Sequence, residues 1–237
     1  MNNYLIEFRF QGKAKNKIRQ LIYQIDKKFS LGITGYKRSI PHITLCGSIS
    51  TDNESKLIKD FIRICSETPM PYFEINGYGF FDANNVVFVD IIPSDKLDNF
   101  RWNLSKNLQP YCQLSPYDYN ENFNFHATLA KDLADQKFVQ IKKFVLSLKK
   151  SKFMHIVIRV TLLKNGKILK EYDFLLRKSL NQKQALDSKI YKRTIKFLKN
   201  YFNGTYDPDK KIKGISFIDR IIQTLKKFCS RLKKIRL

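Results

Sequence analysis

Apolar and polar residues alternate along several short stretches of the chain, which is the pattern of strands with one buried face. The first stretch covers residues 3–10. Further strands are predicted at 39–47, 73–81, 86–92, 123–130, 154–163 and 167–176. The last two flank Asn165-Gly166, a dipeptide that favours a tight hairpin turn.

Between these strands, apolar residues recur every three or four positions, which predicts amphipathic helices. Thr51, Asp52 or Asn53 precedes the second of these helices, and Ser94 or Asp95 precedes the third. Short polar side chains of this kind cap helix N-termini. The predicted helices cover residues 13–29, about 53–65, 95–108 and 134–148.

The order of elements repeats at an offset of 84 residues. At this offset His42 falls on His126, and each is followed by a predicted helix. The strand 3–10 falls on 87–94, and 73–81 falls on 157–165. The two halves share little identity outside the histidine motifs, so the repeat is one of element order.

The composition changes beyond Leu180. From there on the chain holds 16 Lys and Arg against 4 Asp and Glu, about half of the net charge of +23. Residues 189–202 and 215–237 have helical spacing, and a turn-rich connector joins them. The prediction is a domain at 1–179 and a basic helical C-terminal extension at 180–237. The apolar face of the last segment carries Ile218, Ile221, Ile222, Leu225, Phe228 and Leu232.

A sequence pI near 9.8 indicates an anionic partner, either nucleic acid or an anionic membrane. Three interpretations of the basic extension stay open. It packs its apolar face on the core or the preceding helix, it binds RNA, or it lies on a membrane surface. Nothing in the sequence indicates an obligate protein partner.

The four cysteines form no CxxC pair, which is typical of reduced thiols in a reducing compartment. The first ten residues resemble neither a signal peptide nor a membrane span. No apolar run approaches the ~18 residues that a membrane helix needs. These features predict a cytoplasmic protein.

Two of the three histidines begin the same four-residue pattern, His42-Ile43-Thr44-Leu45 and His126-Ala127-Thr128-Leu129. A given histidine has Thr and Leu at these two positions roughly once in a hundred cases or fewer. On a strand, residues i and i+2 share a face. Each His/Thr pair is therefore predicted to face a cleft, while its apolar partners face the core.

Paired histidines suit phosphodiester chemistry. Because imidazole has a reference pKa near ~6.5, one copy can accept a proton while the other donates one. The hydroxyls of Thr44 and Thr128 can donate hydrogen bonds to phosphate oxygens. This chemistry needs neither a metal nor a cofactor. For a lone strand histidine such as His155, a structural or surface role is the better interpretation.

The paired motifs HITL and HATL resemble those of the 2H phosphoesterase superfamily, and the 2′-5′ RNA ligase-like and cyclic phosphodiesterase branch is most similar. The resemblance covers about residues 1–178. It implies a bilobal α+β fold with an internal β-α-β-α-β repeat around a central, positively lined cleft. It also implies hydrolysis or transfer at RNA 2′,5′-phosphodiester bonds or 2′,3′-cyclic phosphates, with His42 and His126 catalytic and Thr44 and Thr128 at the phosphate. The helical extension departs from the compact family pattern.

Further candidate substrate contacts are Tyr36, Lys37, Arg38, Phe125 and Lys131. An aromatic ring among them can stack on a base, although an ordinary core or surface position is the favoured interpretation of each aromatic. Lys37 and Arg38 could contact a phosphate or form a solvated loop pair. Lys131 lies near the place where the family often continues its second motif with a basic residue. The alternative function is a non-catalytic RNA-binding protein that uses the cleft and the basic C-terminal helices. The sequence leaves open the substrate, the acid and base assignment, the oligomeric state and any ligase activity.

Overall fold

The computed structural model describes residues 2–32, 40–120, 123–150 and 152–212. Its strands are β1 (Asn3–Arg9), β2 (His42–Ser50), β3 (Tyr72–Phe81), β4 (Val86–Pro93), β5 (His126–Ala130), β6 (Lys152–Ile156), β7 (Arg159–Lys164), β8 (Lys167–Asp173) and β9 (Lys178–Leu180). Its α-helices are α1 (Gly12–Phe29), α2 (Glu54–Glu67), α3 (Asp95–Leu108), α4 (Asp135–Ser147), α5 (Gln182–Ala185) and α6 (Ser188–Phe202). The fold is α+β, as predicted.

Local sequence explains most of these boundaries. The side chain of Asn53 accepts a hydrogen bond from Lys56 N and starts α2, and Ser94 caps α3 in the same way. Asn165 and Gly166 both have positive φ, which is the requirement of the tight hairpin turn between β7 and β8.

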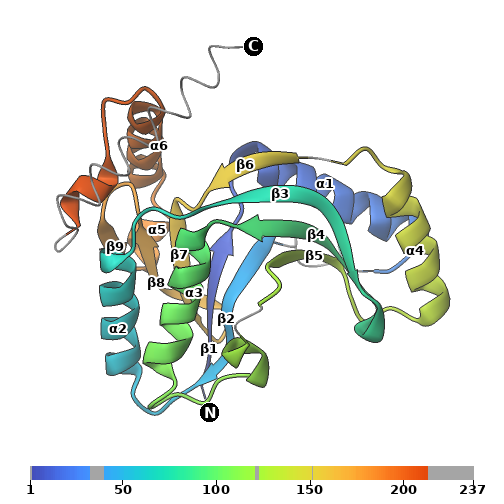
Figure 1. Cartoon of the computed structure of the whole chain (residues 1–237), viewed down its shortest axis with the longest axis horizontal. Coiled ribbons are helices and arrows are strands. Elements are labelled where there is room, and N and C mark those ends of the chain that lie inside the picture. Colours follow the sequence, from blue (N-terminus) through green and yellow to red (C-terminus); the bar gives the residue numbers. More distant parts are fainter. Residues whose placement is uncertain (1, 33–39, 121–122, 151, 213–237) are drawn as a thin grey trace.

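The strands form two antiparallel sheets, in the orders β2-β1-β7-β8-β9 and β5-β4-β3-β6. Helices α2 and α3 lie together beside the first sheet, and α1 and α4 lie together beside the second (Figure 1). Each sheet with its two helices forms one lobe, and the two halves of the repeat exchange elements between the lobes. The first half gives α1 and β3 to the second lobe. The second half gives α3 and β7 to the first lobe. The lobes are interlocked, and one continuous hydrophobic core runs through both.

The predicted strand 154–163 is wrong as a single element. The chain breaks at Val157 and Ile158, which are buried, and crosses from one sheet to the other. Strand β6 pairs with β3 in the second sheet, while β7 pairs with β1 in the first. The sequence carries no sign of this crossing, because Val157 and Ile158 in the link are as apolar as the strand residues on either side of them.

Buried polar contacts tie helix α6 to the first sheet. Arg159 donates hydrogen bonds to Asp173, Glu171 and Thr194, and the hydroxyl of Thr194 also bonds to Asp173. Thr194 is fully buried on α6. The described part of the extension therefore packs on the sheet, and its separation at residue 180 stays a prediction.

The predicted helix 215–237 lies outside the described residues, as do Tyr36, Lys37 and Arg38. None of the helices in the described part of the chain combines the length and apolar character required to cross a bilayer.

Candidate active site

Both histidine motifs lie on edge strands. Strand β2 ends the first sheet and β5 ends the second, and these two edges lie side by side where the lobes meet. Burial alternates along each motif. Ile43, Leu45, Ala127 and Leu129 are buried, while both histidines and both threonines are partly exposed. The folding of the interlocked halves thus brings the two His/Thr pairs to one seam between the sheets.

The two imidazole rings are held by the same hydrogen bond. His42 Nδ1 lies 2.9 Å from the Ile40 carbonyl oxygen, and His126 Nδ1 lies 2.8 Å from the Asn124 carbonyl oxygen. A carbonyl oxygen can only accept, so each Nδ1 carries the proton. In the neutral ring Nε2 is then the proton acceptor, and both rings present the same nitrogen for chemistry.

Charged groups surround His42. The Nε2 atom lies 3.8 Å from Glu7 Oε2, and Arg9 Nε donates to Glu7 Oε1 at 2.5 Å. Strand pairing explains this cluster, because Arg9 lies opposite His42 and Glu7 lies opposite Thr44. The Glu7 side chain is 4% exposed, whereas that of His42 is 42% exposed. A largely buried carboxylate therefore lies beside a solvent-accessible imidazole.

Aromatic rings surround His126. The ring of Phe81 meets the imidazole edge-on with centroids 5.0 Å apart, and the Phe88 ring lies at 5.2 Å. Burial lowers the pKa of His126 below its ordinary value. The hydrogen bond to the Asn124 carbonyl offsets part of this shift, and the nearby His42 adds to it. The neutral form of His126 is therefore favoured.

The hydroxyls of the two motif threonines lie beside the histidines. Within the described residues, neither Thr44 nor Thr128 shows a side-chain hydrogen bond to another part of the chain. Each lies two residues beyond its histidine on the same face of its strand. A phosphate at the seam would find a hydroxyl donor from each lobe.

The remaining predicted contacts fare differently. Phe125 is 1% exposed and packs edge-on against Phe123, so its ring is not available to a substrate, and its prediction as a contact is corrected. Its side chain points to the core because Phe125 lies one position before His126 in an extended segment. Lys131 follows β5, is 67% exposed and pairs with Asp132 at 3.1 Å.

Sequence reasoning missed several residues around the histidines. Glu7 and Arg9 are charged residues within a strand that is otherwise rich in apolar residues. Their charge was the feature of the sequence that could have indicated a role at the site. Phe81 and Tyr117 offered none, since aromatics are common throughout the chain. With His126 they line a hollow of about 650 Å³, together with Phe80, Asp82, Ala83 and Asn84. No group of three or more His, Cys, Asp and Glu in the described ranges has the arrangement of a metal site.

Comparison with known proteins identifies the class. The sequence model of the 2′-5′ RNA ligase superfamily matches residues 14–167, a span that contains both histidine motifs. The chain therefore belongs to the 2′-5′ RNA ligase superfamily of 2H phosphoesterases. No curated protein matches the chain with significant sequence similarity.

Several solved structures resemble the chain at low identity. The crystal structure of E. coli LigT complexed with ATP is 18% identical, with a TM-score of 0.48, over 73% of this chain and 97% of that one. A crystal structure described as a phosphoesterase is 16% identical, with a TM-score of 0.46, over the same shares of the two chains. Kluyveromyces marxianus Usb1 with uridine monophosphate is 13% identical, with a TM-score of 0.37, over 68% of this chain and 93% of that one.

Proposed function

We propose that this protein is a metal-independent phosphoesterase acting on RNA 2′,5′-phosphodiester bonds or 2′,3′-cyclic phosphates. The observation that carries the proposal is the matched pair of His/Thr motifs on two adjoining sheet edges. Each histidine has the same Nδ1–carbonyl bond two residues upstream. Membership of the 2′-5′ RNA ligase superfamily supports the substrate class.

The surroundings of the two rings favour different roles. His126, with its lowered pKa, is the group we assign as general base. Its Nε2 takes a proton from water or a hydroxyl as that oxygen attacks phosphorus. We assign His42 as general acid, since it is the second imidazole of the pair and its Nε2 lies 3.8 Å from the Glu7 carboxylate, which can help to orient the ring. As the phosphorus–oxygen bond breaks, His42 gives its proton to the leaving oxygen, so the proton balance closes.

The phosphate and the nucleobase of the substrate would contact different parts of the site. The hydroxyls of Thr44 and Thr128 would donate hydrogen bonds to the non-bridging oxygens, where negative charge concentrates. The hollow beside His126 presents Phe81 and Tyr117, and stacking of a base on such a ring is typically worth ~1–3 kcal/mol. Tyr117 is 42% exposed, which leaves its ring accessible. We therefore propose Phe81 and Tyr117, in place of Phe125, as the candidate base contacts.

A cytoplasmic location is part of the same proposal. The three described cysteines, Cys46, Cys65 and Cys112, are buried free thiols, which suit a reducing compartment.

The test is a product assay in EDTA. Wild type, His42→Ala and His126→Ala would be incubated with a 2′,5′-linked oligoadenylate and with an RNA ending in a 2′,3′-cyclic phosphate. We expect wild type to cleave one substrate and both variants to lose turnover. Salt-sensitive RNA binding without turnover, unchanged in both variants, would instead support the non-catalytic RNA-binding alternative.

A further inference from the structure

A large apolar hollow lies away from His42 and His126, between α6, β6 and the start of α1. Its volume is about 760 Å³. The lining is mostly apolar and includes Tyr72, Met154, Ile156, Ile195, Leu198 and Phe202. Three of these large side chains are well exposed: Tyr72 at 41%, Met154 at 58% and Phe202 at 63%. So much exposed apolar surface in one place marks an interaction site.

Helix α6 leaves an apolar stripe uncovered along this hollow. Tyr191, Ile195, Leu198 and Phe202 follow each other at intervals of three or four residues, so they share one face of the helix. Thr194, by contrast, anchors another face through the buried contacts with Arg159 and Asp173. Across the hollow, β6 is the edge strand of its sheet.

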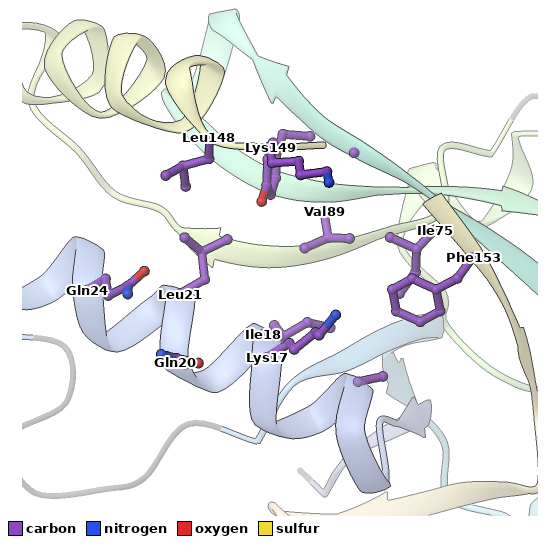
Figure 2. Close-up of a pocket in the computed structure, with 13 residues that line it drawn as sticks. Lys17, Ile18, Gln20, Leu21, Gln24, Ile75, Val89, Leu148, Lys149 and Phe153 are labelled. Atoms are coloured by element: carbon purple, nitrogen blue, oxygen red, sulfur yellow. The ribbon is translucent and has the colours of Figure 1, made fainter. Parts of the chain in front are cut away.

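A second hollow adjoins the first. Its volume is about 280 Å³, and it shares Ala14 and Phe153 with the larger one. Figure 2 shows Ile18 and Leu21 of α1 facing Val89 of the second sheet across this space, with Leu148 at the far end. Together the two hollows form an apolar trough, which is the name used below. The trough runs along α1 from the end of α4 to α6.

The described chain ends at the rim of this trough. The carboxylate of Asp209 accepts hydrogen bonds from Met70 N at 2.8 Å and from Lys96 Nζ at 3.3 Å, and both of these residues line the larger hollow. Ile212, the last described residue, is 4% exposed. The following 25 residues, 213–237, carry the six-residue apolar stripe from Ile218 to Leu232.

The lengths are compatible. The six peptide steps from Ile212 to Ile218 span at most about 20 Å when extended. Because Asp209 is hydrogen-bonded to Met70 at the rim, the stripe begins within this distance of the trough. As a helix, the fifteen residues from Ile218 to Leu232 would be about 22 Å long. A short tether also gives the segment an effective concentration on the order of millimolar at the trough.

We propose that the apolar stripe of residues 218–232 docks in the trough as an intramolecular interaction. Burial of the stripe against Met154, Leu198 and Phe202 supplies the favourable free energy. Charge determines which face of the segment 218–232 turns toward the trough. Lys13 and Lys96 line the larger hollow, so the Lys and Arg residues of the segment are repelled from it and face solvent. The proposal does not depend on the proposed enzymatic activity.

The test measures whether residue 154 is covered. In the full chain carrying Cys229→Ser, a Met154→Cys thiol would be labelled with a small thiol reagent, while the buried Cys46, Cys65 and Cys112 react slowly. We expect labelling at least tenfold slower than when Leu225→Asp is added. Gln223→Asp makes the same change of charge on the opposite face of the predicted helix, so it should leave labelling slow. A Val139→Cys thiol on α4, where Val139 is 48% exposed, should label equally fast with and without Leu225→Asp.

Several outcomes would overturn the proposal. Equal, fast labelling of the Met154→Cys thiol with and without Leu225→Asp would show that the segment does not cover the trough. Protection that disappears on tenfold dilution of the protein would assign the trough to a second copy of the chain. Protection that requires vesicles of anionic phospholipid would assign it to a membrane surface. Circular dichroism of each variant would confirm that slow labelling does not reflect a change in fold.

Discussion

The two lobes present the same motif in opposite surroundings. On β2, His42 is solvent-accessible and lies beside the Glu7 carboxylate, while on β5, His126 packs against Phe81 and Phe88. The backbone holds both rings identically. The repeat therefore supplies two equivalent imidazoles, and neighbouring strands make them different. In the proposed mechanism a symmetric pair would have no preferred direction of proton transfer, and the burial that lowers the pKa of His126 makes the two rings different.

The largest expected effect tests whether the two histidines act as one unit. His42→Ala and His126→Ala should each lower kcat by ~10²–10⁴-fold, because each removes a proton-transfer group. The double variant should fall little further than the worse single variant, since the groups work in one concerted step. Steady-state kinetics on the substrate found in the product assay would measure this. Independent, multiplying losses would contradict it.

The next effect tests the charged side of the comparison. Glu7→Gln replaces the carboxylate 3.8 Å from His42 Nε2 with a neutral amide, so we expect kcat/KM to fall about tenfold. Steady-state kinetics of wild type and variant measure the change. The matched control is Glu67→Gln, because Glu67 is 57% exposed and pairs with Arg63. An unchanged kcat/KM in Glu7→Gln would contradict a role for this carboxylate at His42.

A smaller effect tests the aromatic side. Phe81→Ala admits water to His126 and should raise the pKa of this ring toward its ordinary value. More of His126 is then protonated on the acid side of the profile, so the acid limb of kcat/KM moves to higher pH and the rate there falls severalfold. Titration of the His126 ring by NMR gives the pKa directly. A value that stays in place would exclude Phe81 as the cause of the shift.

Much of the fold was predictable because its elements are locally encoded. The capping residues Asn53 and Ser94, the turn at Asn165-Gly166 and the alternation around His42 and His126 all act over a few positions. The exchange of strands between the lobes was not predictable in this way. Strands β3 and β7 enter the opposite sheets through long-range pairing, and their sequences alternate as they would in either sheet.

The candidate site shows the same division. The motif predicts which residues face the seam, because strand geometry fixes alternate side chains. It does not predict Glu7, which comes from the neighbouring strand β1 through sheet register, or Phe81, which comes from the end of β3, two strands away from β5 in the sheet. Phe125 failed as a contact for the same geometric reason that His126 succeeded, since neighbouring residues of an extended segment point to opposite sides.

The smallest expected effect on activity belongs to His155, the histidine outside the motifs. It packs against the rings of Phe8, Phe10 and Phe73, and its buried Nε2 has no hydrogen-bond partner in the described part of the chain. Burial lowers the pKa of His155 to about 4. Below the unfolded-state pKa of ~6.5 the unfolded chain binds a proton that the folded chain does not. Stability is therefore lost as pH falls from about 6.5 toward 4.

His155→Phe removes this titration while keeping an aromatic ring in the cluster. Wild type should lose about 3 kcal/mol more than the variant between pH 7 and pH 4, and turnover at pH 7 should stay the same. Urea unfolding at several pH values measures the difference. An identical pH dependence in both proteins would mean that His155 keeps its ordinary pKa. Lost turnover would mean that it belongs with His42 and His126. The expected result would show that His155, which is buried without a partner, has a structural role. His126 is also buried, but it shares its seam with a second imidazole and two threonine hydroxyls.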